Sequence, residues 1–356
     1  MKKNWVDSKV EKFSSIGGYQ KPQLNKNSLK LDSNENYVLS KEFQNDIISE
    51  ARQNSDVREY PLGGVERLIE MISKFVKVPT SMIGIGNGSD QILDLILSNF
   101  ASKETKVLTS NPTFSFFEER CKLYSIPLIA IPFSNDMKLD IKEFIKESKN
   151  ADILYLDSPN NPTGFQFSKI ELQKLIKSFD GLVIIDEAYG EFSDYSLSSL
   201  VKTQNNLIVV RTLSKSFGMA GLRLGYFIAN KKFTDAFLNV LQYPYPLSTI
   251  TIESGILALK KVNLMKNATE IIQFERKRII ETLKKFDTFE VFDSKANFVL
   301  FDAHSNYKRV YSALEEQGIS IRKLGKIGNH EGCLRVTIGT KEMNSKFLLA
   351  IRDLLK

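Results

Sequence analysis

The sequence contains few of the residues on which several kinds of site depend. Its 356 residues include two cysteines, Cys121 and Cys333, and two histidines, His304 and His330. The cysteines lie far apart and have no CxxC spacing, so neither a disulfide framework nor a zinc site is expected, and the pattern fits a reducing compartment. With so few histidines, a histidine-based triad or a histidine-rich metal site is not expected either. Any proton transfer would depend on lysine, tyrosine or carboxylate groups.

Long apolar runs and blocks of like charge are also missing. No stretch approaches the roughly 18 consecutive apolar residues of a membrane-spanning helix. The N-terminal MKKNWVDSKVEKF lacks the apolar segment of a signal peptide, so we expect a cytoplasmic protein. The 49 basic and 42 acidic residues give a net charge of +7 that is spread along the chain. We interpret this as a solvated surface with a mild preference for anionic ligands, and expect no nucleic acid partner.

Three continuous apolar runs in the middle of the chain predict buried strands. They are DILYLD at 152–157, GLVIID at 181–186 and LIVV at 207–210. Continuous runs are typical of strands that are covered by helices on both faces, and so of a parallel sheet. Between the first two runs, SKIELQKLIKS at 168–178 predicts a helix with Ser168 as N-cap and Glu171 three residues later. This alternation favours an α/β fold.

The pattern changes after about residue 260. Residues 268–286 predict a long amphipathic helix, and the segment CLRVTIGT at 333–340 alternates between apolar and polar positions. Its Arg335 and Thr337 share one face, which is typical of a strand in a half-covered sheet. We therefore predict a large domain at 36–258 and a smaller α+β domain at 259–356. The segment 1–35 is expected to pack near the small domain or a partner subunit.

The segment IGIGNGSDQ, from 83 to 91, predicts a glycine-rich loop that opens a helix. Backbone N–H groups at the start of a helix suit a phosphate. A dinucleotide fingerprint would require GxGxxG and an acidic residue about twenty positions later. This segment has GxGxG and no such acid, so NAD is not favoured. An ordinary helix start with Ser89 as N-cap is the alternative.

Polar clusters follow all three buried runs. DSPNNPTG begins at Asp157, DEAYGE begins at Asp186, and RTLSKSFGMAGLRLGY begins at Arg211. Ligands of open α/β sheets bind at the carboxyl ends of the strands, so these clusters are expected to meet in one pocket. A phosphate anchor, a carboxylate for a ring nitrogen at Asp186 and an amine at Lys215 together match the requirements of pyridoxal phosphate.

In this order, SPNNPTG, DEAY and TLSKSFGMAGLRLGY resemble the class II pyridoxal-phosphate-dependent aminotransferases of fold type I. More narrowly, LDSNEN, YPLGG, GNGSD, ANFVL and LRVTIGT resemble the histidinol-phosphate aminotransferase family, and the matches run from about residue 31 to 340. The resemblance implies a large domain with a mainly parallel sheet between helices, and a smaller C-terminal domain. It also implies a homodimer with shared active sites. The implied reaction converts L-histidinol phosphate and 2-oxoglutarate to 3-(imidazol-4-yl)-2-oxopropyl phosphate and L-glutamate, in histidine biosynthesis.

The resemblance also implies roles for individual residues. Lys215 would bind the cofactor covalently and move the proton at the substrate's α-carbon, while Asp186 would pair with the ring nitrogen. The other residues expected at the cofactor are Asn161 and Tyr189 at the ring's 3-oxygen, Phe114 stacked on the ring, and Ser89, Asp90, Thr212, Ser214, Arg223 and the neighbouring subunit's Tyr60 at the phosphate. The residues expected to contact the substrate are Tyr19, Asn34, Arg322 and Arg335.

Three alternatives stay open. The choice of substrate is open because the chain departs from the family's usual motifs in two places. It has GGYQ where a proline usually precedes the tyrosine, and NENYVLS where NENP is usual. The same fold and cofactor also serve aromatic amino-acid aminotransferases and decarboxylases of phosphorylated amino acids. A binding or regulatory protein that has lost the chemistry is the third alternative, and the presence of both Lys215 and Asp186 argues against it.

Overall fold

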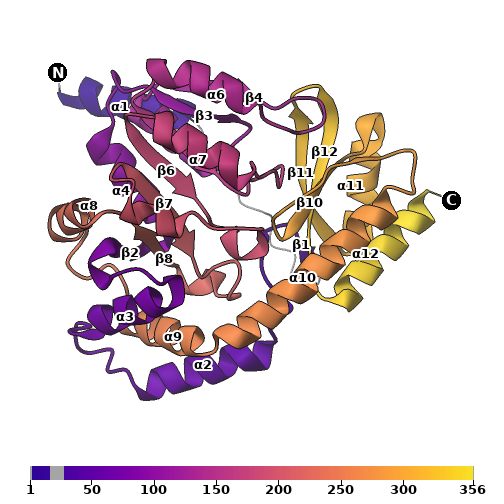
Figure 1. The fold of residues 1–356 in the computed structure, drawn as a ribbon. Coiled ribbons are helices and arrows are strands. Elements are labelled where there is room, and N and C mark those ends of the chain that lie inside the picture. The colour runs from indigo at the N-terminus through magenta and orange to yellow at the C-terminus, as the bar shows by residue number, and fades with distance from the viewer. Residues whose placement is uncertain (1, 17–27, 356) are drawn as a thin grey trace.

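The computed structural model describes residues 2–16 and 28–355, which form two sheets with helices packed around them (Figure 1). The larger sheet has seven strands in the order β2-β8-β7-β6-β5-β3-β4. These strands are β2 (Ile83–Asn87), β3 (Val107–Asn111), β4 (Leu128–Pro132), β5 (Ile153–Asp157), β6 (Leu182–Asp186), β7 (Leu207–Thr212) and β8 (Leu224–Ile228). From β4 to β7 all neighbours are parallel, and β8 runs antiparallel to both β7 and β2.

Helices cover both faces of the larger sheet. They are α2 (Lys41–Gln53), α3 (Gly64–Val76), α4 (Gly88–Phe100), α5 (Ser115–Tyr124), α6 (Ile141–Glu147), α7 (Lys169–Ser178), α8 (Lys231–Ala236) and α9 (Thr249–Lys260). Alternate residues of β5 enter different cores: Leu154 packs with residues of α2, α3, α7 and α9, and Tyr155 packs with residues of α4 and α5. Both faces of the strand are therefore dry, which explains why its sequence is continuously apolar.

The strands and the helix predicted in this region are confirmed. The three apolar runs correspond to β5, β6 and β7, which pair in parallel. Helix α7 begins after Ser168, whose hydroxyl accepts from the backbone N–H of Glu171 at 3.3 Å. The Glu171 carboxylate accepts in return from the backbone N–H of Ser168 at 3.1 Å, which completes the capping box. The predicted α/β class with a mainly parallel sheet is confirmed.

The smaller sheet has five strands in the order β1-β11-β12-β10-β9. They are β1 (Leu29–Leu31), β9 (Glu290–Val291), β10 (Phe298–Asp302), β11 (Ile319–Ile327) and β12 (His330–Thr337), and they pack against α10 (Val262–Leu283), α11 (Tyr307–Glu316) and α12 (Lys341–Leu354). Helix α10 begins and ends earlier than the helix predicted at 268–286. Each sheet has a hydrophobic core of its own, and the division into 36–258 and 259–356 stays a prediction.

The N-terminal segment contacts both parts of the chain. Helix α1 (Lys2–Ile16) lies beside α5, where the Lys12 ammonium donates to the Ser125 hydroxyl at 3.3 Å. Strand β1 instead pairs in parallel with β11 of the smaller sheet. Within the described ranges, every helix is too short or too polar to cross a membrane.

Strand β12 is buried on both of its faces, so the predicted half-covered sheet is wrong. Leu334 and Val336 pack in the core of the smaller sheet, as expected. Arg335 and Thr337 on the other face are only 7% and 1% exposed. Their face turns toward the larger sheet, where polar side chains and backbone groups take the place of water. The alternating sequence therefore reflects a polar interface inside the protein.

The predicted glycine-rich loop is also wrong, because Gly84 and Gly86 lie in strand β2. A Cβ atom on Gly84 would lie 2.1 Å from Cε1 of Phe227, and one on Gly86 would lie 2.6 Å from Cγ1 of Ile92. These glycines allow close packing of the strand. Only Gly88, with a φ of +76°, turns the chain into α4, and the N-cap is Asn87 rather than Ser89.

Candidate active site

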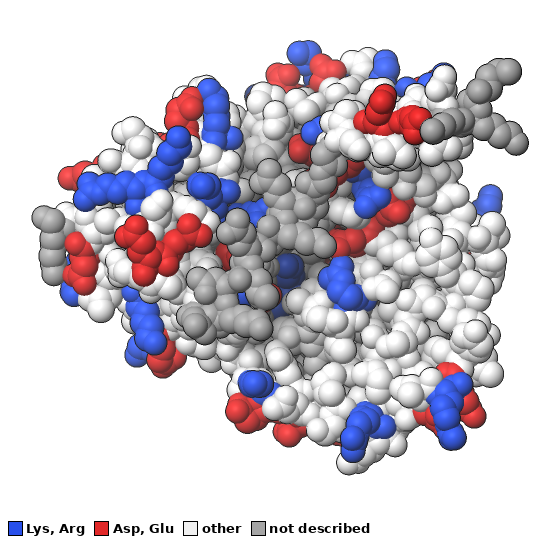
Figure 2. All heavy atoms as spheres, turned by 180° about the vertical axis from the view of Figure 1, so that it is seen from behind, with Lys and Arg blue, Asp and Glu red and all other residues white. Residues whose placement is uncertain are grey.

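The polar clusters that follow β5, β6 and β7 meet at one edge of the larger sheet. Asp157 and Asp186 are register partners, because β5 and β6 are parallel neighbours. A cavity of about 520 Å³ opens at this edge. The site residues predicted from the sequence that line it are Asn34, Ser89, Asp90, Phe114, Asn161, Asp186, Tyr189, Thr212, Ser214, Lys215, Arg223, Arg322 and Arg335. Figure 2 shows a hollow near the middle of one face, with Lys or Arg atoms visible inside it.

Asp186 is a buried carboxylate at the cavity wall. Its Oδ1 accepts from the backbone N–H of Ala188 at 2.9 Å, and its Oδ2 accepts from the Tyr155 hydroxyl at 3.3 Å. Burial, and to a lesser degree the charge of Asp157, raises the pKa of Asp186 to about 7. Among the described residues, no basic side chain forms an ion pair with Asp186. A cationic ring nitrogen would supply the missing positive charge and hold this carboxylate ionised.

Lys215 brings an amine to the same cavity from the segment after β7. Its Nζ donates to the backbone oxygen of Ser33 at 3.2 Å and lies 5.8 Å from the centre of the Tyr189 ring. The segment after β1 therefore helps to place the lysine, although Ser33 is far away in the sequence. The amine is partly buried between the two sheets, a position from which it can act on a bound small molecule.

Tyr189 and Asn34 form a buried hydrogen-bonded pair. The Asn34 amide Nδ2 donates to the Tyr189 oxygen at 2.8 Å, so the phenol O–H proton is available for another acceptor. Burial raises the pKa of Tyr189 to about 12, so the phenol is protonated at neutral pH. Asn34 has a φ of +57° and is held there because its N–H donates to the Thr337 hydroxyl at 3.0 Å and its carbonyl accepts from Asn297 at 3.0 Å.

The start of α4 forms a cluster of donors at one end of the cavity. A Cβ atom on Gly88 would lie 2.6 Å from Nη2 of Arg223, and one on Gly225 would lie 2.4 Å from the backbone nitrogen of Ser89. Both glycines thus let the backbone and the guanidinium approach closely. Arg223 donates to the Asp90 carboxylate at 2.6 Å.

Two hydroxyl groups complete this end of the cavity. The Thr212 hydroxyl lies 2.9 Å from the Ser214 hydroxyl and accepts from the Ser214 N–H at 3.1 Å. Unpaired N–H groups in the first turn of a helix, together with hydroxyls and a guanidinium, suit a phosphate.

Two arginines of the smaller sheet reach the other side of the cavity. Arg335 donates from Nη1 to the Asn161 amide oxygen and from Nη2 to the Asp32 backbone oxygen at 3.1 Å. Its guanidinium lies 5.0 Å from the centre of the Phe298 ring. Arg322 is its register partner across the β11–β12 ladder, so both guanidiniums belong to one face of the hairpin. Adjacent guanidiniums favour an anionic ligand.

Two of the predicted site residues are not among the described residues that line the cavity, and several residues that do line it were not predicted. Tyr60 is 70% exposed, stacks on Tyr245 with ring centres 4.3 Å apart, and is not among the residues that line the cavity. Tyr19 falls outside the described residues. Lining residues that sequence reasoning missed include Asp32, Ser33, Thr113, Glu118, Asp157 and Lys326. Asp157 carried a signal, because it ends a buried strand just as Asp186 does.

Comparison with known proteins decides the family. The family model for aminotransferase class I and II matches residues 24–351 of the chain. The chain belongs to the class I and II aminotransferases. A curated relative from Thermoanaerobacter pseudethanolicus, named histidinol-phosphate aminotransferase, is 34% identical over 331 residues, which is 92% of this aminotransferase and 93% of the relative.

Solved structures share the fold of this aminotransferase. The histidinol-phosphate aminotransferase from Clostridium acetobutylicum has a TM-score of 0.83 at 29% identity, covering 91% of this chain and 98% of that chain. A decarboxylase from Sulfurospirillum multivorans has a TM-score of 0.83 at 25% identity, covering 99% and 97%. The predicted fold type and enzyme class are confirmed.

Class I and II aminotransferases use pyridoxal phosphate, so the predicted cofactor is confirmed. The residues of this chain fit it on three independent observations. Asp186 is a buried acid with a raised pKa, Gly88 leaves room that a Cβ atom would fill at the start of α4, and Lys215 supplies an amine in the same cavity. The roles of the single residues stay predictions.

Proposed function

We propose that this aminotransferase moves the amino group of L-histidinol phosphate to 2-oxoglutarate, giving 3-(imidazol-4-yl)-2-oxopropyl phosphate and L-glutamate in histidine biosynthesis. The observation that carries the proposal is the pair of register-matched guanidiniums, Arg322 and Arg335, on the cavity. A guanidinium fork binds a phosphate and a carboxylate equally well, as a site that takes both substrates in turn requires. Similarity to curated relatives named histidinol-phosphate aminotransferase supports the choice.

Lys215 is the proposed proton carrier. When bound, pyridoxal phosphate withdraws electrons from the substrate's α-carbon. Lys215 would hold the cofactor covalently through Nζ, and the same Nζ would carry the proton at the substrate's α-carbon. The Ser33 backbone oxygen, which accepts from Nζ at 3.2 Å, would orient the lysine during the proton transfer.

The neighbouring residues would orient the ring and hold its charges. Asp186 would keep the ring nitrogen protonated. Because Oδ1 of Asn161 accepts from Arg335, its Nδ2 is the donor that remains for the ring's 3-oxygen. The Tyr189 hydroxyl accepts from Asn34, so it can donate to the same oxygen. In this way Asn34 and Arg335, both predicted to contact substrate, also orient the residues that hold the cofactor.

A homodimer with shared active sites is the proposed assembly. Exposed apolar side chains cluster on two segments, with Val57 and Leu62 near Tyr60, and Val240 and Tyr243 near Tyr245. Stacking of Tyr60 on Tyr245 joins the two segments. Monomeric proteins seldom expose an apolar patch of this kind, so it supports a subunit interface from which Tyr60 would reach the neighbouring site. The cytoplasmic location stays a prediction.

A second candidate is the decarboxylation of a phosphorylated amino acid. The similarity to the Sulfurospirillum multivorans decarboxylase, which covers nearly the whole chain, favours a decarboxylation, and the two cavity arginines suit a phosphorylated substrate. An aromatic amino-acid aminotransferase, which shares the fold and the cofactor, is the remaining alternative.

A paired assay separates these functions. The purified enzyme is given L-histidinol phosphate, phenylalanine or O-phosphothreonine, with 2-oxoglutarate present, and both glutamate and carbon dioxide are measured. The proposal predicts glutamate from histidinol phosphate at a kcat/KM well above that for phenylalanine, and no carbon dioxide. Carbon dioxide from O-phosphothreonine, without turnover of histidinol phosphate, would establish the decarboxylase instead.

A further inference from the structure

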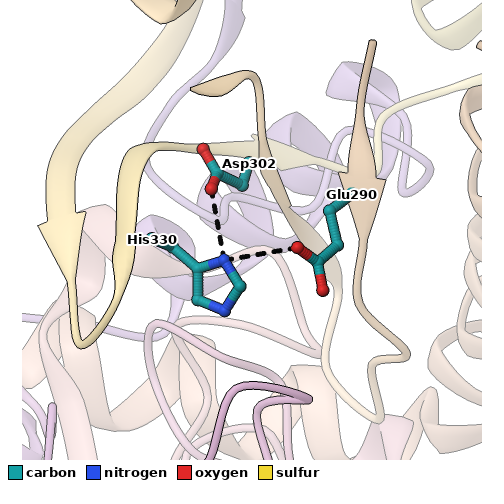
Figure 3. A group of neighbouring side chains, drawn as sticks. All are labelled: Glu290, Asp302 and His330. Atoms are coloured by element: carbon teal, nitrogen blue, oxygen red, sulfur yellow. Dashed lines mark hydrogen bonds and ion pairs between the residues drawn. The ribbon is translucent and has the colours of Figure 1, made fainter. Parts of the chain in front are cut away.

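Three ionisable side chains of the smaller sheet converge outside the aminotransferase cavity. They are Glu290 on β9, Asp302 on β10 and His330 on β12 (Figure 3). Strand β10 lies between the other two, which brings the three residues together. One ligand atom from each residue lies within 4.8 Å of those of the others. Asp302 and His330 are buried, while Glu290 is exposed and opens the group to solvent.

Both ring nitrogens of His330 face oxygen atoms. Nε2 lies 2.7 Å from the backbone oxygen of Asn135, and a carbonyl oxygen only accepts, so Nε2 carries a proton. Nδ1 lies 3.2 Å from Oδ2 of Asp302 and 3.4 Å from Oε2 of Glu290. In a neutral imidazole this arrangement would point the Nδ1 lone pair at two carboxylates. A metal ion between the three groups would accept this lone pair and balance the two carboxylates. Nδ1 of His304 also lies 3.2 Å from Oδ2 of Asp302, beside the same group of side chains.

Two of the three distances between ligand atoms match the edges of a metal coordination tetrahedron. Zinc bonds of about 2.0–2.1 Å to nitrogen and oxygen place neighbouring ligand atoms of a tetrahedron about 3.3–3.4 Å apart. The separations of 3.2 and 3.4 Å from Nδ1 agree with this value. Three protein ligands leave a fourth position for water on the side that Glu290 opens to solvent.

The surroundings of the group also resemble those of a metal ligand set. The other nitrogen of a metal-bound histidine usually donates to a carbonyl or carboxylate, as Nε2 of His330 does to Asn135. Asp302 is fixed in turn, because its Oδ1 accepts from the backbone N–H groups of His304 at 2.7 Å and Gly332 at 3.0 Å. These contacts hold two ligands in place before any ion binds.

We propose that Glu290, Asp302 and His330 bind a divalent transition-metal cation of the zinc type. This departs from the sequence-based expectation that the chain has no metal site. The ion would tie the smaller sheet to the larger one, since His330 and Asn329 both bond Asn135, which follows β4. The β11–β12 hairpin, whose second strand begins at His330, also carries the two cavity arginines. The ion would therefore stabilise the hairpin that positions them.

Zinc titration of the enzyme loaded with its cofactor tests this site. After treatment with a chelator and dialysis, isothermal titration with Zn²⁺ should show one ion per chain, and Mg²⁺ at the same concentrations should show none. At zinc a hundredfold above its dissociation constant, the thermal unfolding midpoint should rise on the order of 3–4 °C. Zinc-soaked crystals should give an anomalous peak between the three side chains.

Matched variants assign the binding to these residues. Glu290→Gln removes a charged ligand from an exposed position and should weaken zinc binding at least about tenfold. Asp293→Asn makes the same charge change at a nearby exposed carboxylate, which pairs with Lys284 at 3.0 Å, and should bind zinc as the wild type does. Equal binding by wild type and Glu290→Gln, or no stoichiometric binding at all, would overturn the proposal.

Discussion

Replacement of Asp186 by asparagine should have opposite effects on the stability of the cofactor-free protein and on activity. Burial raises the pKa of Asp186 from 3.8 to about 7, so the folded chain binds this proton more tightly than the unfolded chain. The contribution of Asp186 is therefore most favourable below about pH 4 and is lost as the pH rises through about 7. Three pKa units at about 1.36 kcal/mol each give an upper bound of about 4 kcal/mol for the penalty, which is the loss of folding stability that ionised Asp186 causes at pH 8.

Asparagine removes this penalty and retains the local hydrogen bonds. Its Oδ1 can accept from the Ala188 N–H, and its amide can donate to the Tyr155 oxygen, so both neighbours keep a hydrogen bond to residue 186, with the direction reversed at Tyr155. Urea unfolding of the cofactor-free protein at pH 5 and pH 8 measures the effect. Asp186→Asn should be more stable than wild type at pH 8, and the difference should shrink by roughly 2–3 kcal/mol at pH 5.

The same substitution should abolish most of the activity, because a neutral amide cannot hold a proton on the ring nitrogen. A variant that is no more stable than wild type at pH 8, or whose advantage is the same at both pH values, would refute the assignment of a buried, uncompensated carboxylate. Full activity in the same variant would refute its role toward the cofactor.

Three other substitutions test separate parts of the account. Arg335→Lys keeps the charge but loses the fork, so KM for histidinol phosphate should rise about tenfold or more in steady-state assays, whereas an unchanged KM would place the substrate anion elsewhere. Tyr60→Ala should weaken self-association and reduce cofactor affinity, as measured by light scattering and equilibrium dialysis; a dimer of wild-type strength with full affinity would contradict the shared site. Arg211→Met leaves the buried carboxylates of Glu187 and Glu191 without their cation, so unfolding in urea should show a loss of about 3–5 kcal/mol, and a loss below 1 kcal/mol would show that the cluster is neutralised in another way.

The fold and the centre of the site were predictable because their signals are local. The strand at 153–157 is apolar because both its faces are buried. Because β5 and β6 are parallel neighbours, the polar residues at their carboxyl ends lie at the same edge of the sheet. Asp186 ends one such strand and Lys215 follows another, so their meeting in one cavity follows from topology.

The remaining features depend on residues that come together only through the tertiary fold. Gly84 suggested a loop because the surrounding sequence gives no sign of Phe227. In the fold, the ring of Phe227 fills the space that a side chain at position 84 would need. Arg335 suggested an exposed face because its acceptor, Asn161, follows β5 of the other sheet and is far away in the sequence. Glu290 and His330 lie on different strands, and only the sheet order places them beside Asp302.

The central claim is that the strand-end cavity holds pyridoxal phosphate through Lys215. Borohydride reduction of the purified enzyme, followed by proteolysis and mass spectrometry of the peptides, tests it most directly. The account predicts the reduced cofactor on the peptide that contains Lys215, and a Lys215→Ala protein with no labelled peptide and no glutamate formation from histidinol phosphate and 2-oxoglutarate. Label on another lysine, or full turnover by Lys215→Ala, would contradict it.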